Sequence, residues 1–476
     1  MASSSSLSLH LLLLFAILAI LATLIESKPT FQLPGASFYK SSFKQAKAPK
    51  PKIPYTAYYF PQVLDHFTFH PKSSKIFYQK YLINSHYWHK GGPIFVYTGN
   101  EGHIEWFAAN TGFLLDIAPK FKALLVFIEH RFYGESMPFG KDSYKSAETL
   151  GYLNSQQALA DYAVLIRSLK HNLSSESSPV VVFGGSYGGI ATNEYVCVCF
   201  HVINKIYFSA GQLDASMNCY EVIKGSWAEL DALSVQKEGL TELSKIFRTC
   251  KDLHSADSAL DWLWEAFVYT AMVNYPTEAN FMKPLPAYPV QQARLLQMAM
   301  CKIIDGMPPE TTKLRRAIAG ASLYYNYSQT EKCFEIEHGA DVHVLSGWNW
   351  QACTEMIMPM TCSNKSMFPP SGFDYKDVER IELALKRFGS NIIFSNGMQD
   401  PWSRGGVLKN ISSSIIALVT KKGAHHVDFR FETKDDPDWL VELRRQEVDI
   451  IQKWIHEYYA DVRQGIVSQC CRSSDL

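Results

Sequence analysis

The stretch Gly184-Gly185-Ser186-Tyr187-Gly188 matches the pattern G-x-S-x-G and directly follows the apolar run VVVF. Glycines in this pattern let the chain turn sharply between a strand and a helix, so that the serine Oγ projects above a sheet. Such a hydroxyl is a candidate nucleophile. A glycine-rich structural turn is the alternative, because the pattern also arises by chance. The apolar run before it favours the nucleophile.

A serine nucleophile needs a base, and the base needs an acid that orients it. Asp400 follows the run NIIFSNG, and His425 and His426 follow the run SIIALVT. Both positions are predicted turns at strand ends, and the order Ser, Asp, His is that of the α/β hydrolases. Asp400 before Pro401 is also typical of an Asx turn. Periodicity does not decide which histidine is the base.

An acyl-transfer site of this kind also needs donors for an oxyanion. The amide of Tyr187, directly after the serine, is the first candidate. The second should lie in the loop after an earlier strand, where the sequence reads TGNEG and contains Asn100. A simple turn is the alternative interpretation of that loop.

Short apolar runs alternate with helical patterns along much of the chain. We expect buried strands at 92–99, 123–130 and 180–185, and the strand pattern resumes at 391–397 and 414–426. Between the second and third runs, Leu159, Tyr162, Ile166 and Leu169 recur at intervals of three and four and predict one apolar helix face. The alternation predicts a doubly wound, mostly parallel α/β sheet of the α/β-hydrolase type.

The middle of the chain has a helical pattern instead, which predicts a cap over the active-site edge of the sheet. We therefore expect a first part of the core at 55–217, a helical cap at 218–340 and a second part of the core at 341–476. Residues 28–54 are rich in Lys and Pro and predict a pro-segment or flexible arm. Near the C-terminus, Asp436 and Pro437 predict the start of a helix.

The N-terminus contains an almost unbroken apolar run from Leu11 to Ile25. A spanning helix needs roughly 20 apolar residues, so a cleaved signal peptide at 1–27 fits better than an uncleaved anchor. We therefore expect the secretory pathway, with no membrane association after cleavage. That route favours disulfides and glycans. The sequons begin at Asn172, Asn326, Asn364 and Asn410.

Composition limits the classes of partner and cofactor that the chain is expected to bind. The chain of 476 residues contains 46 Lys plus Arg and 46 Asp plus Glu, so its formal charge is zero. This balance gives no indication of a nucleic-acid partner. Ten cysteines are present, but none has the spacing of zinc ligands, and we expect no metal and no cofactor. A homodimer is left open.

Six short sequences occur in order: YTGNEG, FIEHRFYGES, GGSYGG, the WxxQACTE pattern at 348–355, FSNGMQDPWS and GAHHVD. Together they resemble the S28 family of serine peptidases, over about residues 53 to 460. The wording of the motifs is more similar to the Pro-Xaa carboxypeptidase branch than to dipeptidyl peptidase II.

The resemblance implies cleavage of peptides beside proline, by an α/β hydrolase with a helical cap, in a lysosome, a vacuole or the extracellular space. It implies Ser186 as nucleophile, Asp400 as triad acid and His425 as base. Ile190, Met358 and Trp402 match positions that line a proline pocket. An apolar, aromatic slot suits a pyrrolidine ring. Ordinary core packing is the alternative for Met358 and Trp402.

The chain departs from the family in two segments, 190–217 and 375–386. The first is rich in β-branched residues, which favour strand over the helix that the family has there, and contains Cys197 and Cys199. Ile190 stands where the family usually has methionine, and Arg404 replaces a glycine. The second segment lacks family cysteines that would partner Cys353 and Cys362. The cysteines left for bridges in the cap are Cys219, Cys250, Cys301 and Cys333.

Other functions remain as alternatives. The same motifs fit an aminopeptidase that resembles dipeptidyl peptidase II, an esterase on the same fold, or a catalytically silent isoform. A short ester tested against a peptide with penultimate proline separates the esterase from the peptidases.

The two departures have the form of altered exon joins. We predict that RNA reads spanning the codons for 189–218 decide whether the printed order is transcribed. Continuous reads in this order would establish the segment as part of the natural chain, and their absence would refute the sequence there.

Overall fold

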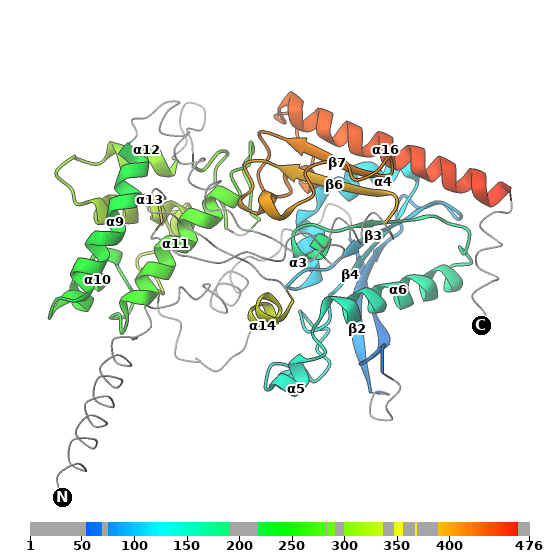
Figure 1. The fold of residues 1–476 in the computed structure, drawn as a ribbon, viewed down its shortest axis with the longest axis horizontal. Helices are drawn as coiled ribbons and strands as arrows, with labels where there is room; N and C mark the ends of the chain where they lie inside the picture. The colour runs from blue at the N-terminus through cyan, green and yellow to red at the C-terminus, as the bar shows by residue number, and fades with distance from the viewer. Residues whose placement is uncertain are drawn as a thin grey trace, which may run out of the picture. The chain divides into compact units, whose positions relative to one another are not determined.

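The computed structural model describes residues 54–68, 75–190, 218–281, 283–290, 299–336, 347–355, 367–368 and 389–464 (Figure 1). The expected signal peptide at 1–27 and almost all of the arm at 28–54 lie outside these residues. Most of both departing segments, 190–217 and 375–386, also lies outside them. So do Met358, Asn364, Cys197, Cys199 and Cys362, and the side chains of Ile190, Cys353 and Arg404.

A five-stranded mixed sheet forms the first part of the core, in the order β1-β2-β4-β3-β5. β1 and β2 form an antiparallel pair, and β2 continues antiparallel to β4. The strands β3, β4 and β5 run parallel to one another. The strand bounds are β1 Thr56–Val63, β2 Ile76–Asn84, β3 Ile94–Thr98, β4 Leu124–Ile128 and β5 Val180–Phe183.

The strands β3 and β4 are buried at every position because both faces of the sheet are covered. Successive side chains of a strand point to opposite faces. In β3, Ile94 and Val96 pack with α6 (Ser155–Asn172), whereas Phe95 and Tyr97 pack with α3 (Ile104–Asn110) and α4 (Gly112–Phe121). Figure 1 shows α6 on one side of the sheet and α4 on the other.

The predicted apolar face of α6 is wrong at one end. Leu159 is 40% exposed, and the buried apolar stripe contains Ala158, Tyr162, Leu165 and Leu169. The stripe is rotated because the helix also buries Asp161, which accepts two hydrogen bonds from the buried Arg131, at 2.6 and 2.7 Å. Counting only apolar residues could not find a face that includes a carboxylate.

The expected strands near the C-terminus form a sheet of their own. β6 (Ile392–Gly397) and β7 (Ile415–Thr420) are parallel to each other, and among the described residues neither pairs with β5. The expected α/β architecture is therefore confirmed in its mixed form, a mixed sheet with a helical region. The single, mostly parallel sheet is not seen in the described part of the chain.

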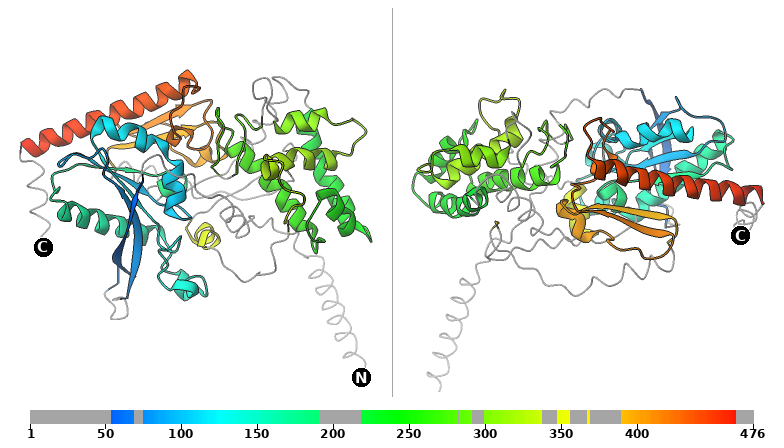
Figure 2. Two further views of the ribbon diagram at one scale, coloured as in Figure 1. Left: turned by 180° about the vertical axis from the view of Figure 1, so that it is seen from behind. Right: turned by 90° about the horizontal axis from the view of Figure 1, so that it is seen from above.

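A helical region follows in the middle of the chain, and Figure 2 shows its helices gathered into one bundle. Disulfides join Cys219 to Cys301 and Cys250 to Cys333. In chain order the first cysteine pairs with the third and the second with the fourth, a crossed pattern. The helices are α9 Asn218–Ser234, α10 Gly239–Phe247, α11 Ala256–Met272, α12 Met300–Gly306 and α13 Lys313–Asn326.

The remaining helices lie around the core. The long helix α16 begins at Asp438, with Pro437 as its N-cap, so the expected start at Asp436 was early. The carboxylate of Asp436 pairs with Arg444 instead. None of the helices in the described ranges has the length and apolar character that crossing a membrane requires. The other bounds are α5 Ala147–Leu150, α7 Tyr187–Ile190, α14 Gly347–Thr354, α16 Asp438–Arg463, η2 Gly140–Asp142, η3 Pro401–Gly405 and η4 Val427–Phe429.

We predict that the double substitution Cys250→Ser/Cys333→Ser lowers the free energy of unfolding by about 4 kcal/mol, because a disulfide that closes a long loop restricts the unfolded chain. The loop spans 83 positions. Thermal melting measures the loss, and mapping of unreduced peptides checks the pairing. Recovery of a Cys219–Cys250 peptide would contradict the crossed pattern.

Candidate active site

Ser186 lies in a strained turn between β5 and α7. Its side chain is exposed and its φ is 54°, in the left-handed region that a non-glycine residue rarely adopts. A methyl group on Gly184 would lie 2.1 Å from the carbonyl oxygen of Gly188, so the turn closes only without side chains there. This is the geometry of a nucleophile elbow. Strain of this kind persists only where the surroundings hold it.

The end of β3 supplies that support. The hydroxyl of Thr98 lies 2.8 Å from the carbonyl oxygen of Gly188 and 3.0 Å from that of Phe183. The side-chain amide of Asn100 donates to the carbonyl oxygen of Gly185 at 2.5 Å, and its own oxygen accepts from the Tyr97 hydroxyl at 2.9 Å. The side chain of Asn100 therefore holds the elbow.

Asp400 and His425 form a buried pair. Nδ1 of His425 lies 2.8 Å from Oδ2 of Asp400. The other carboxylate oxygen of Asp400 accepts the backbone N–H of Trp402 at 2.9 Å and caps η3. The two sequence interpretations of Asp400, Asx turn and partner of a histidine, therefore hold at once. The turn fixes the carboxylate, and the carboxylate orients the imidazole.

The turn that carries His425 touches the elbow. A methyl group on Gly185 would lie 3.2 Å from the ring of Phe429 and 3.5 Å from that of His426. The elbow and the histidine turn are therefore so close that a single methyl group added to Gly185 would touch both rings. Of the two histidines, His425 pairs with Asp400, whereas the ring of His426 packs edge-on against Phe281, with centroids 5.0 Å apart.

Two buried groups set the electrostatics around this turn. Burial raises the pKa of Glu101, in the loop after β3, to about 7, and the nearby His425 opposes the rise. Burial, and then the charges of His425 and Arg430, hold the pKa of His426 well below its usual range. A buried imidazole that resists protonation is poorly suited to gain a proton during a reaction. The electrostatics therefore favour His425 over His426 as the base.

The side chain of Tyr187 lies within a buried chain of hydrogen bonds. The Tyr133 hydroxyl donates to Oε1 of Gln351 at 2.5 Å, and the Gln351 amide donates to the Tyr187 oxygen. The Tyr187 hydroxyl lies 3.2 Å from Nε2 of His130, whose Nδ1 donates to the Arg131 carbonyl at 2.6 Å. Burial lowers the pKa of His130 to about 4, so Nε2 is free to accept. The network anchors the residue whose amide was predicted as an oxyanion donor.

Sequence comparison agrees with this geometry. The profile of the family described as serine carboxypeptidase S28 matches residues 62–198, 195–377 and 383–447, which together are most of the chain. The chain belongs to the S28 family. The breaks between the three matches fall within or beside the two segments in which the sequence departs. The first two matches overlap at residues 195–198, which lie inside the first departing segment.

Curated relatives of this S28 peptidase cover nearly its whole length. The chain is 37% identical to lysosomal Pro-X carboxypeptidase of Mus musculus over 86% of this chain and 91% of the relative. It is 36% identical to that of Homo sapiens over 94% of this chain and 97% of the relative. It is 27% identical to the thymus-specific serine protease of Homo sapiens over 93% of this chain. The chain is therefore a serine peptidase similar to Pro-X carboxypeptidases.

The end of helix α11 in the middle region meets this S28 site. Nε1 of Trp402, half-buried, lies 3.1 Å from Sδ of Met272, and the Met272 carbonyl accepts the backbone N–H of His425 at 3.1 Å. The Tyr275 hydroxyl donates to the His425 carbonyl at 3.0 Å. Of the expected proline-pocket residues, the structure describes the side chain of Trp402. Met358 and the side chain of Ile190 lie outside the described residues.

A group of possible metal ligands and three of the sequons also lie among the described residues. His103, Glu105 and Glu129 bring potential metal ligands within 4.8 Å of one another. Glu129 is already bonded to backbone amides and Ser136, and Lys80 lies 2.5 Å from Glu105. This group therefore carries no metal assignment. Of the sequons, Asn172 and Asn410 are exposed and Asn326 is half-buried.

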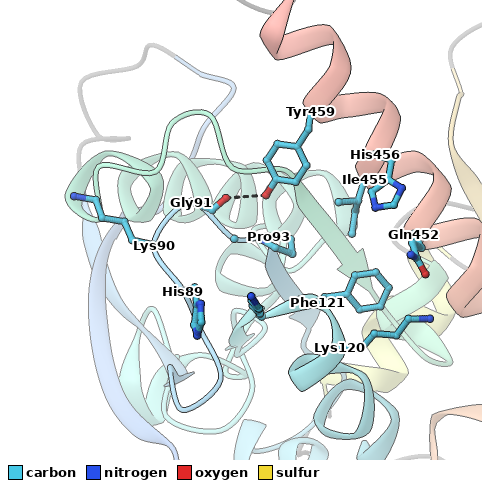
Figure 3. Close-up of a pocket in the computed structure, with 12 residues that line it drawn as sticks. His89, Lys90, Gly91, Pro93, Lys120, Phe121, Gln452, Ile455, His456 and Tyr459 are labelled. Atoms are coloured by element: carbon cyan, nitrogen blue, oxygen red, sulfur yellow. Dashed lines mark hydrogen bonds between the residues drawn. The ribbon is translucent and has the colours of Figure 1, made fainter.

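A hollow of about 480 Å³ lies at the opposite edge of the sheet (Figure 3). Residues 89–93 and 120–122 of its lining directly precede β3 and β4, and the rest lie on α16. Ser186 instead follows β5, and because these three strands are parallel, it lies at the other edge of the sheet. The Tyr459 hydroxyl donates to the Gly91 carbonyl across the hollow at 2.7 Å. The hollow is lined by His89, Lys90, Gly91, Gly92, Pro93, Lys120, Phe121, Lys122, Gln452, Ile455, His456 and Tyr459. None of its lining residues belongs to the elbow or to the histidine turn, so it is not the candidate active site.

Sequence reasoning missed several supporting residues. Gln351 stood inside a quoted motif, but its partners Tyr133 and Tyr187 are far away in the chain. Glu101 directly follows Asn100, yet nothing in the sequence indicates that its carboxyl group is buried. Met272 reads as ordinary helix core. These roles depend on tertiary contacts, which local spacing does not encode.

We predict that Gln351→Leu lowers the free energy of unfolding by about 1–3 kcal/mol, because it removes a hydrogen-bond partner from two buried hydroxyls. Thermal melting of this variant and of its control measures the loss. The exposed Gln156→Leu is the matched control. Equal melting temperatures for these variants would contradict the network.

Proposed function

We propose that this S28 peptidase releases the C-terminal residue of peptides whose penultimate residue is proline, with Ser186, Asp400 and His425 as its triad. The observation that carries the proposal is the contact between the elbow and the histidine turn, with His425 already paired to Asp400. The family and the names of the relatives, Pro-X carboxypeptidase, support the substrate class.

In the first step, Oγ of Ser186 attacks the carbonyl carbon of the proline residue while Nε2 of His425 takes the hydroxyl proton. Asp400 holds Nδ1–H and stabilises the imidazolium. The backbone N–H of Tyr187 donates to the oxyanion. Because the Asn100 side chain holds Gly185, its contribution to the oxyanion is best assigned to its backbone N–H.

In the second step, His425 gives its proton to the departing amine, and the peptide bond breaks to leave an acyl-enzyme. Water then attacks the ester carbon, His425 takes a proton from that water, and Ser186 regains its hydrogen. The products are the free amino acid and a peptide that ends in proline. No cofactor enters this scheme.

Specificity for proline is assigned to an apolar slot that includes Trp402, with Met358 and Ile190 as its further members. A flat indole side suits the rigid pyrrolidine ring. The contact of Trp402 with Met272 supports assigning the end of α11 to the border of this slot. The proposed compartment is an acidic one, a lysosome or vacuole, because relatives are named lysosomal. The extracellular space, reached by secretion, is the alternative.

We expect a fluorophosphonate probe to label the folded chain at Ser186, and Ser186→Ala to lose both labelling and peptide turnover, by at least about 10⁴-fold. Mass spectrometry of a Pro-Phe-terminated peptide at acidic pH should show free phenylalanine. The same peptide with an amidated C-terminus, or with alanine in place of proline, is the matched control.

Each outcome has a separate meaning. Release of an N-terminal dipeptide would replace the carboxypeptidase with an aminopeptidase. Hydrolysis of a short ester without peptide cleavage would indicate an esterase. Soluble, folded protein that takes no label would establish a silent isoform.

A further inference from the structure

Helix α16 holds the turn that carries His425. The buried guanidinium of Arg444 donates from Nε to the Asp428 carbonyl at 2.9 Å, and from Nη2 to the carbonyls of Arg430 at 2.8 Å and Val427 at 3.3 Å. Its Nη1 pairs with Asp436. One side chain therefore ties the main chain of the turn to the C-terminal helix.

A pair of carboxyl groups lies beside this tie. Glu447, one helical turn after Arg444, is 4% exposed, and Asp428 of the histidine turn is 5% exposed. Glu447 faces Asp428, the hydroxyl of Ser395 on β6 and the charge of Arg444. Among the described residues, no N–H or O–H group donates a hydrogen bond to either carboxyl oxygen of Glu447. Burial, and then the charge of Asp428, hold the pKa of Glu447 well above its usual range.

Two buried carboxyl groups that face each other cannot both be ionised without repulsion, so such a pair retains one proton. Arg444 does not remove this restriction, because the hydrogen bonds that the structure gives it go to three carbonyl groups and to Asp436. Losing the proton would push Asp428 away from α16. Asp428 lies three positions after His425, and Phe429 beside it contacts the elbow at Gly185.

We propose that Glu447 and Asp428 are positioning residues, and that a proton held by Glu447 and donated to the Asp428 carboxylate keeps the His425 turn against α16. The proposal rests on the proposed triad. It assigns the loss of activity at high pH to a pair remote from the reacting atoms. The sign follows from the raised pKa: the stabilisation is complete in acid and is lost as the pH rises through the value in the folded protein.

This pair and the base act on opposite sides of the pH profile. Protonation of a general base reduces turnover in acid. Ionisation of the carboxyl pair reduces turnover in alkali. Glu447→Gln supplies an amide N–H to the Asp428 carboxylate and has no proton to lose there. The substitution should therefore move the alkaline side of the profile and leave the acid side in place.

The test is the rate of fluorophosphonate labelling between about pH 5 and pH 8. The ratio of the rate at pH 8 to that at pH 5 should be at least about tenfold higher in Glu447→Gln than in the natural chain, which corresponds to a shift of one pH unit. Asp428→Asn should act in the same direction and serves if the first variant does not fold. Glu442→Gln, exposed on the same helix, should leave the profile unchanged. If the labelling rate falls equally toward pH 8 in the natural chain, in Glu447→Gln and in Asp428→Asn, the proposal is refuted.

A second measurement does not need activity. Hydrogen–deuterium exchange of a peptide covering residues 423–430, corrected for the intrinsic rate, should show protection lost between about pH 5 and pH 8 in the natural chain and retained in Glu447→Gln. A chain that takes no label but shows this difference would refute the proposed function and support the pair. Protection that is independent of pH in both chains would refute the pair alone.

Discussion

The positive φ of Ser186 is the constraint on which the site depends. The serine is presented by a backbone conformation that is unfavourable in itself, so neighbouring groups must hold it. Gly184 permits the close approach, and Thr98 and Asn100, at the end of the neighbouring strand, bind the carbonyl groups on either side. The buried strand β3 is thus as much a part of the site as the serine, because its end fixes the elbow.

His425, the proposed base, is held from three directions. Asp400 orients its ring, the end of α11 with Tyr275 binds its backbone, and Arg444 of α16 ties down the turn that follows. These partners come from the second sheet region, the middle helical region and the C-terminal helix. The position of one imidazole therefore depends on folding of parts that are distant in sequence. This dependence explains why the site needs both the core and the helical region.

The local sequence predicted the features that depend on short-range residue patterns. The strands β3, β4 and β5, the elbow at Ser186 and the positions of Asp400 and His425 at strand ends follow from apolar runs, glycines and order. The face of α6 was misplaced because Asp161 is buried with Arg131, and the start of α16 was placed too early because Asp436 binds Arg444 instead. The roles of Gln351 and Glu101 could not be predicted, because their partners or burial come from elsewhere in the chain. The catalytic roles and the proline pocket remain predictions.

The crossed disulfides change what a single peptide-bond cleavage can do. With Cys219 joined to Cys301 and Cys250 joined to Cys333, every bond between residues 219 and 333 lies inside at least one closed loop. A cut anywhere in that interval leaves the two fragments covalently connected, whereas consecutive pairs would release one of them after a cut between residues 250 and 301. The helical region can therefore be nicked once without separating from the rest of the molecule.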